Sequence, residues 1–410
     1  MKKLITVMAM LAMVAVALPA MASDVPGYAV TVGGRVKVDA GWQILPGNDD
    51  DKFVQNNSTD STIVNFFNTT NTNSYLRVLF TSADKTTGAH LEFGLGSREN
   101  MQNDGVLNGA FAGTRFCYGW WKTGSCRLVI GHFAGRLGDR YYAGSSLGLE
   151  KSLKSNLESF GFIGWSRNTK IALQMEVNEN FSFEVAIGQP GTEGTITDVF
   201  GANTGSTNNW LPRLEVVADI KFGSFMISPG FGVSYSKWNF DGAGADDENL
   251  FSFLLQLPAK YTAGPLAVIF NAYYAQNRYT DWTGEYGSES NMRRFQFGGN
   301  PVLPVYTAAD GVDNTKEWGL GLAVNYAISE QLGINAGLGV AQLKNSAWEV
   351  GDSAGKYTKF GAFVAIPYKL TSNFTIAPEI GYYNYGKNPR NDDEKRGDEW
   401  LLGVHFQFLF

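Results

Sequence analysis

The sequence is mildly acidic and rich in aromatic residues. Its 410 residues include 33 Lys and Arg against 39 Asp and Glu, with three histidines, which gives no electrostatic basis for binding nucleic acid. Beyond residue 22, no uncharged apolar run approaches the roughly 18 residues of a membrane-spanning helix, so the sequence predicts no such helices.

The first residues have the pattern of an export signal. Two lysines precede an uncharged apolar stretch over Leu4–Pro19, and residues 20–22 match the small-x-small cleavage motif. A short membrane anchor is the alternative, but no stop-transfer charges flank the stretch. We therefore expect residues 1–22 to be a cleaved signal peptide and residues 23–410 to form one exported domain.

Strict alternation of apolar and polar residues recurs along the rest of the chain. Val36 and Val38, for example, alternate with Arg35 and Lys37. The clearest segments are 30–42, 170–177, 181–187, 317–328, 374–383 and 400–410. Because side chains of a strand point alternately to its two faces, these segments predict an all-β, transmembrane antiparallel barrel. Averaging over both faces also explains the near-neutral mean hydropathy of −0.15.

Short turns alternate with long polar stretches along the sequence. The turns are expected at 83–86, 122–125, 178–180, 221–224, 262–265, 329–331 and 371–373. The long stretches lie near 44–72, 98–108, 134–167, 190–209, 241–248, 280–315, 346–355 and 388–397. Seven turns and eight loops predict sixteen strands, with short periplasmic turns and long extracellular loops. A hairpin hidden in 190–209 or 280–315 would make eighteen.

The last strand carries the most specific signal. Apolar residues occupy every second position from Trp400 and end in Phe406, Phe408 and Phe410. This segment resembles the C-terminal strand of bacterial outer-membrane proteins. The resemblance implies that these phenylalanines are the signal read by the barrel-assembly machinery.

With the turn-and-loop pattern, the chain resembles the trimeric general-diffusion porins of Gram-negative bacteria. The resemblance implies an outer-membrane homotrimer, in contact with lipid and lipopolysaccharide. It also implies passive diffusion of small hydrophilic solutes and ions through a water-filled channel, with no cofactor and no catalysis. Two alternatives stay open: a substrate-specific channel for a sugar or organic acid, and a structural or adhesive barrel without conductance.

Charged residues on the inferred inner faces are the candidate pore lining. The first four strands supply bases, and the later strands supply acids, so we expect opposed rows of charge across the lumen. The bases are Arg35, Lys37, Arg77, Arg98 and Arg115. The acids are Glu176, Glu184, Glu215 and Asp219, with Glu317 and Glu379 later.

The loop at 134–167 is the candidate constriction loop, since the resemblance implies an inward loop after the fifth strand. It contains the acids Asp139, Glu150 and Glu158 and also the bases Arg136, Arg140, Lys151 and Lys154. This mixture departs from the acidic pattern of the family, so the sequence leaves the ion preference open. A loop over the barrel mouth or at a subunit contact is the alternative.

Aromatic residues near the strand ends are expected to anchor the barrel at the membrane interfaces. They are Tyr28, Trp42, Tyr118, Trp120, Trp121, Trp238, Tyr261, Trp318, Tyr368 and Trp400. A second group lies on a loop or on inner faces and would suit a sugar pathway. That group is Tyr141, Tyr142, Tyr273, Tyr383 and Tyr385.

Signals for other chemistry are weak. The histidines at 90, 132 and 405 have no metal-ligand spacing, and no serine has a recognisable nucleophile context, so we expect neither an enzyme nor a metal site. Cys117 and Cys126 could form a local disulfide or stay free. Acidic clusters at 49–51, 246–248 and 392–394 could hold divalent cations, although solvated loop tips are the simpler interpretation.

Overall fold

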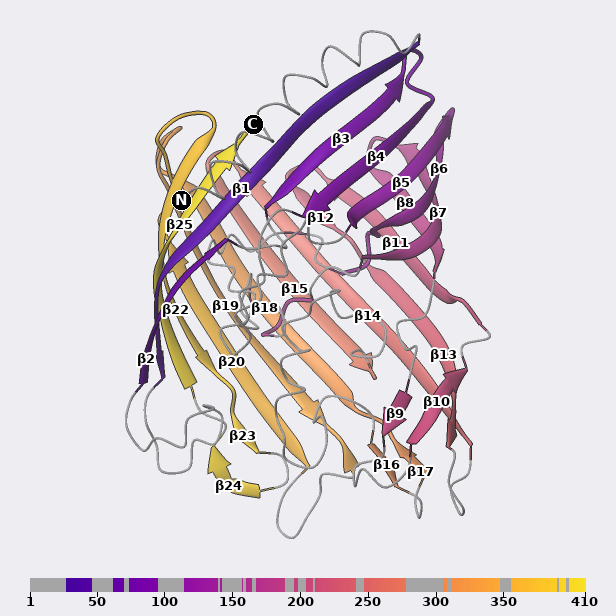
Figure 1. The fold of residues 1–410 in the computed structure, drawn as a ribbon, viewed down its shortest axis with the longest axis vertical. Coiled ribbons are helices and arrows are strands. Elements are labelled where there is room, and N and C mark those ends of the chain that lie inside the picture. Colours follow the sequence, from indigo (N-terminus) through magenta and orange to yellow (C-terminus); the bar gives the residue numbers. More distant parts are fainter. Residues whose placement is uncertain are drawn as a thin grey trace, which may run out of the picture.

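The chain folds into a closed antiparallel β-barrel of 16 strands, which confirms the predicted architecture. Figure 1 shows the tilted strands wrapped around a central lumen. The computed structural model describes residues 27–45, 62–69, 74–94, 114–138, 141, 157, 160–163, 167–188, 195–197, 204–208, 211–240, 247–277, 305–307, 311–346, 355–388, 391–395 and 398–410. The expected signal peptide at 1–22 lies outside these residues.

Each barrel strand pairs with its neighbours in the chain, and the last pairs with the first. In three places two consecutive segments share one position in the ring: β2 with β3, β12 with β13, and β20 with β21. The strands are β1 (Tyr28–Leu45), β2 (Thr62–Thr69), β3 (Tyr75–Ser82), β4 (Thr87–Gly94), β5 (Thr114–Thr123), β6 (Cys126–Ala134), β7 (Arg167–Asn178), β8 (Phe181–Gly188), β11 (Arg213–Phe222), β12 (Phe225–Ile227), β13 (Gly230–Phe240), β14 (Glu248–Ala263), β15 (Leu266–Gln276), β18 (Lys316–Ala327), β19 (Gly333–Lys344), β20 (Lys356–Ala365), β21 (Tyr368–Lys369), β22 (Phe374–Asn384) and β25 (Asp398–Leu409).

Short hairpins lie beyond the barrel wall at the loop end (Figure 1). They are β9 (Thr195–Thr197) with β10 (Thr204–Asn208), β16 (Val305–Thr307) with β17 (Gly311–Asp313), and β23 (Lys387–Asn388) with β24 (Asn391–Lys395). The β9–β10 hairpin extends the edge of β13, and the other two form separate small sheets. The suspected hairpins within 190–209 and 280–315 therefore exist, but neither adds strands to the ring, so eighteen is wrong.

The predicted short turns join neighbouring strands at one end of the barrel. Gly223 and Gly264 have φ values of +59° and +54°, a conformation that suits a tight hairpin and that residues with a Cβ rarely adopt. At the turn after β3, the Ser82 hydroxyl donates a hydrogen bond of 2.6 Å to the Asp84 carboxylate. That bond, with others from Thr86, lowers the pKa of the Asp84 carboxyl below its ordinary value.

The two faces of the barrel wall differ in polarity as the alternation predicts. On β18, Leu320 and Leu322 are exposed on the outer face, whereas Glu317 and Gly321 are buried on the inner face. The same alternation recurs around the ring, where large apolar side chains such as Ile171 of β7, Leu255 of β14 and Ile380 of β22 are exposed on the outer face. A continuous apolar surface of this extent requires an apolar environment or a partner. Within the described ranges, no helix is long and apolar enough to cross a membrane.

The seam between β1 and β25 closes the barrel. Gly34 and Phe410 exchange two backbone hydrogen bonds, of 2.8 and 3.1 Å. On the inner face of the same seam, His405 Nδ1 lies 2.7 Å from Asp39 Oδ1, and both side chains are buried. Phe408 and Phe410 are exposed on the outer face. The first and last strands therefore form one continuous part of the wall.

The two cysteines do not form a disulfide. Both are free: Cys126 pairs with Thr123 beside the turn, while Cys117 pairs with His132 farther along the hairpin. We therefore expect two reactive thiols per chain when the purified protein is denatured without reductant and titrated with a thiol reagent. A value near zero would contradict the register of β5 and β6.

Candidate functional site in the barrel lumen

The loop between β6 and β7 enters the lumen and packs against its wall. Leu137 and Ile163, at its two ends, are buried in one cluster with Val217, Leu254 and Tyr273 of β11, β14 and β15. Burial of this apolar surface fixes the described parts of the loop inside the barrel. These contacts lie on one side of the ring, from β8 to β22, whereas the loop leaves the wall at β6.

Arg136 binds the start of this loop to the acidic part of the wall. Its Nη1 donates to Asp219 Oδ2 at 3.0 Å, and its backbone N donates to Glu184 Oε1 at 2.8 Å. The next contact is between Gly138 N and Gln256 Oε1, at 2.9 Å. Charge-assisted hydrogen bonds such as those of Arg136 are stronger than neutral ones, so they hold the start of the loop in a fixed position against β8 and β11.

Farther along, the loop lies directly on the backbone of the wall. A Cβ placed on Gly161 would stand 2.0 Å from the carbonyl oxygen of Leu320, and one placed on Gly339 would stand 1.6 Å from that of Phe160. Asn271 Nδ2 also donates to Gly161 O at 2.9 Å. Only glycine permits this approach, so the inner glycines of β18 and β19 form the surface on which residues 160–161 rest.

Aromatic side chains complete this contact. The ring of Phe160 lies 5.3 Å from that of Tyr383 and 5.5 Å from that of Tyr385, with the Lys359 ammonium 5.7 Å above it. Tyr385 also donates to Glu399 Oε1 at 3.0 Å. Tyr273, Tyr383 and Tyr385 are thus buried in the packing of the wall and loop rather than displayed along a solute path. Tyr142 lies outside the described residues.

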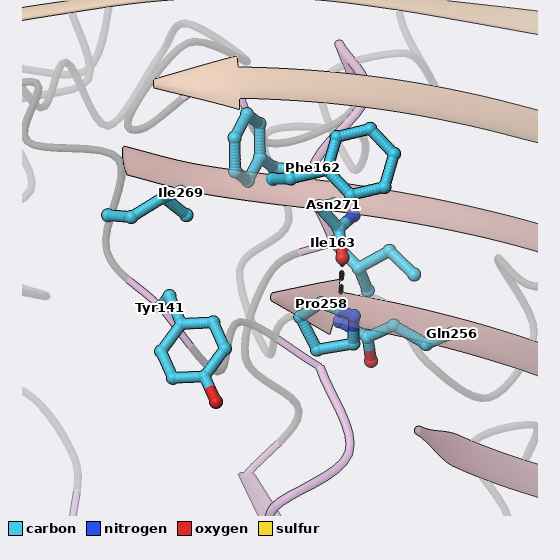
Figure 2. Close-up of a pocket in the computed structure, with 8 residues that line it drawn as sticks. Tyr141, Phe162, Ile163, Gln256, Pro258, Ile269 and Asn271 are labelled. Carbon is cyan, nitrogen blue, oxygen red and sulfur yellow. Dashed lines mark hydrogen bonds between the residues drawn. The ribbon is translucent and has the colours of Figure 1, made fainter. Parts of the chain in front are cut away.

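Figure 2 shows a small crevice where the loop meets β14 and β15. Its lining residues are Tyr141, Phe162, Ile163, Gln256, Pro258, Ile269, Phe270 and Asn271. Most of this lining is apolar, and Gln256 donates to both Gly138 O and Asn271 Oδ1. The crevice is therefore a packing seam that supports the loop.

Basic residues of the early strands line the opposite side of the lumen. The Arg35 guanidinium lies 5.0 Å from the ring centroid of Tyr75, and Arg77 is half-buried opposite Glu92. Lys37 and Arg115 are buried, and Arg115 Nε lies 2.6 Å from Glu92 Oε1. Four of the predicted bases thus share one wall, while Arg98 lies outside the described residues.

Three of the predicted wall acids form ion pairs with bases. Glu184 and Asp219 bind Arg136, and Glu215 lies 3.0 Å from Lys170 Nζ and 2.8 Å from Arg213 Nη2. Elsewhere Glu317 accepts a hydrogen bond of 2.6 Å from Tyr273, Glu379 is buried on β22, and Glu176 is exposed beside the turn after β7. The loop acids Asp139, Glu150 and Glu158 lie outside the described residues.

The sequence missed four groups in the lumen: Glu92, Arg127, Arg136 as an anchor, and Lys170. Two interface aromatics were also misplaced, because Tyr118 and Trp120 face inward and pack with Val129 and Phe133. Trp121, between two inward positions, is exposed on the outer face as predicted. Adjacent residues of a strand face opposite sides, so the Trp120–Trp121 pair was itself a signal.

Acidic and metal-ligating side chains form no cluster of a metal-site type in the part of the chain that the structure describes. Of the predicted acidic clusters, 49–51 lies outside that part, and the side chains of 392–394 are not described. Asp247 forms an exposed ion pair with Lys237 at 2.7 Å.

No protein-family model matches the sequence, and no curated protein matches it. Solved outer-membrane structures do match. The trimer form of OmpT from Vibrio cholerae is 15% identical with a TM-score of 0.54, over 94% of this chain and 100% of that one. The anion-selective porin from Comamonas acidovorans is 11% identical with a TM-score of 0.56, over 93% and 100%. OmpF from Salmonella typhi is 12% identical with a TM-score of 0.53, over 94% and 98%. The chain therefore has the porin fold, as its topology and last strand predicted.

Proposed function

We propose that this chain is an outer-membrane porin, a water-filled channel for passive diffusion of small hydrophilic solutes and ions. The observation that carries the proposal is the closed 16-strand barrel with an apolar outer face and a charged inner face. A barrel of this size is too wide for side chains from its wall to fill. We assign it no catalytic role, since the lumen acids Glu92, Glu215 and Asp219 serve as ion-pair partners of neighbouring bases.

Export and assembly follow from the same proposal. Residues 1–22 are its signal peptide, and Phe406, Phe408 and Phe410 are the signal for the barrel-assembly machinery. The porin fold, found also in a trimer form of OmpT, supports a homotrimer in contact with outer-membrane lipid and lipopolysaccharide. The loop at 134–167 is the constriction of the channel, because its described residues cover the inner wall from β11 to β22.

Conductance in planar lipid bilayers tests the proposal. Purified folded protein should give stepwise current increases in KCl that grow with voltage, whereas heat-denatured protein should give none. Absence of conductance from folded protein would overturn the porin function and favour a structural or adhesive barrel. A sugar or organic acid that blocks the current completely and saturably would favour a substrate-specific channel instead.

The early-strand bases are expected to favour anions. Neither Arg77 nor Arg127 forms an ion pair with a carboxylate of the described residues, and Arg35 is half-buried on the same wall. Replacing Arg35, Arg77 and Arg127 together by glutamine should lower the ratio of chloride to potassium permeability by about threefold. Reversal potentials in a KCl gradient measure this ratio.

Three lysines that do not face the lumen provide the matched control. Lys85 lies in the turn after β3, and Lys316 and Lys356 are exposed on the outer faces of β18 and β20, so their replacement by glutamine removes the same charge from the chain and should change the ratio little. An equal shift in both triple variants would show that the wall bases have no special role. The buried pair Arg115–Glu92 is left intact, because removing one partner would leave a buried charge.

A further inference from the structure

An aromatic patch lies on the inner wall of β4, β5 and β6. It consists of His90, Phe116, Tyr118, Trp120 and Phe133. Tyr118 is its centre: its ring centroid lies 5.1 Å from His90, 6.3 Å from Phe116, 6.1 Å from Trp120 and 5.4 Å from Phe133. These separations are those of interacting aromatic rings, so the patch is one packed surface.

The strand register places this patch on the lumen side. Tyr118 pairs with Gly131 and Trp120 with Val129, while the intervening positions of β5 face outward. A Cβ on Gly131 would stand 2.6 Å from the Cα of Tyr118, so only glycine permits this close approach of β6 to the backbone of β5. Phe116, Tyr118 and Trp120 each remain partly exposed. The patch therefore presents aromatic surface to solutes in the channel.

Cationic groups surround the patch. The Arg127 guanidinium lies 4.8 Å from the Trp120 ring, the Arg167 guanidinium 5.5 Å from Phe116, and the Lys170 ammonium 5.5 Å from Phe133. A guanidinium above a ring uses its planar face in this contact, and its N–H groups point sideways, where a carboxylate can bind. Glu92 is the patch's neighbouring acid, and Arg115 neutralises it.

We propose that this patch binds small aromatic carboxylates, with the ring against Tyr118 and Trp120 and the carboxylate at Arg127. The side chains around the patch favour aromatic carboxylates over aromatic cations and sugars. Aromatic cations would be repelled by Arg127, and sugars would find few hydrogen-bond acceptors, since the nearby polar groups are mostly cationic donors. The inference deepens the proposed channel function, because the ligand reaches the patch through the lumen.

Sodium benzoate is the probe, with acetate and benzyl alcohol as comparisons that lack the ring or the charge. Isothermal titration of the detergent-solubilised protein should show saturable benzoate binding, with acetate and benzyl alcohol at least about tenfold weaker. In bilayers, benzoate should also reduce the KCl current saturably and only in part. Equal responses to benzoate and acetate would overturn the proposal.

Neighbouring tryptophans supply matched variants. Trp120→Leu should weaken benzoate binding about fivefold, and Arg127→Gln by a similar factor. Trp121→Leu should leave it unchanged, since Trp121 is exposed on the outer face. Unchanged binding in both Trp120→Leu and Arg127→Gln would overturn the site, and Tyr118→Leu serves if one of them fails to fold.

The two readouts separate the two proposals. Binding by calorimetry without any conductance in KCl would overturn the channel function but keep the site. Conductance in KCl without benzoate binding would keep the channel and overturn the site.

Discussion

Gly339→Val is expected to raise the single-channel conductance of the barrel. A Cβ at this position would stand 1.6 Å from the carbonyl oxygen of Phe160, an overlap that no side-chain movement relieves. Gly339 lies in the ladder between Gly321 and Gly361, so the wall is held on both sides and the loop has to move. Residues 160–161 then lose their contact with the wall, and the loop that forms the proposed constriction is no longer held in its position across the lumen.

We expect the conductance to increase by about twofold, measured in KCl with folded protein. Channel conductance depends on the width and charge of the narrowest section. Permeability to larger uncharged solutes in liposome-swelling assays should rise in the same direction. The matched control is Gly119→Val, whose added Cβ would make only an ordinary contact, 3.5 Å from the backbone oxygen of Gly88.

A second variant tests the same contact between residues 160–161 and the wall without adding side-chain atoms. Asn271→Ala removes the hydrogen bond to Gly161 O and should produce a smaller rise in conductance. Wild-type conductance in both variants, with the barrel folded, would show that residues 160–161 do not limit the channel.

The position of the loop inside the barrel could not be predicted from the sequence, for a physical reason. In the sequence, Gly319 and Gly321 are only the small inner-face residues of the alternating segment 317–328, and a gap in a strand's surface does not say what fills it. The ring of Tyr273 fills the space at Gly319, and the ring of Phe162 fills the space at Gly321. Phe162 belongs to a segment more than 150 residues away from Gly321 in the chain. The barrel itself was predictable because alternation and turn chemistry are local.

The misplaced residues of β5 and β6 have a different cause. A one-residue shift in register exchanges the two faces of a strand. The β4–β5 pairing shifts between Glu92 and Phe93, so Arg115 and Phe116 both reach the inner side even though they are consecutive. Such a shift cannot be read from alternation, and the turn at 122–125 left the face of Arg127 open for the same reason.

Gly34→Val is expected to prevent formation of the closed barrel. Its added Cβ would stand 2.4 Å from one ring atom of Phe410 and 2.5 Å from the backbone oxygen of Tyr75. Because Gly34 and Phe410 exchange two backbone hydrogen bonds, displacing the ring also disturbs the end of the β1–β25 ladder. That ladder joins the two ends of the sheet, and without it two edges would carry unpaired backbone groups.

At the urea concentration that unfolds half of the wild type, the ratio of folded to unfolded Gly34→Val should be lower by at least about tenfold, since overpacking against backbone costs more than the roughly 1.4 kcal/mol that a tenfold change in this ratio represents. Electrophoresis of unheated samples separates the compact barrel from the unfolded chain and measures this ratio. Gly119→Val adds the same side chain to an open position of the wall and should run like the wild type. If Gly34→Val also ran as a compact barrel, the contact between Gly34 and Phe410 would not be required for closure. Loss of the compact barrel in Gly34→Val but not in Gly119→Val would show that closure requires the β1–β25 seam, where Phe410 covers Gly34.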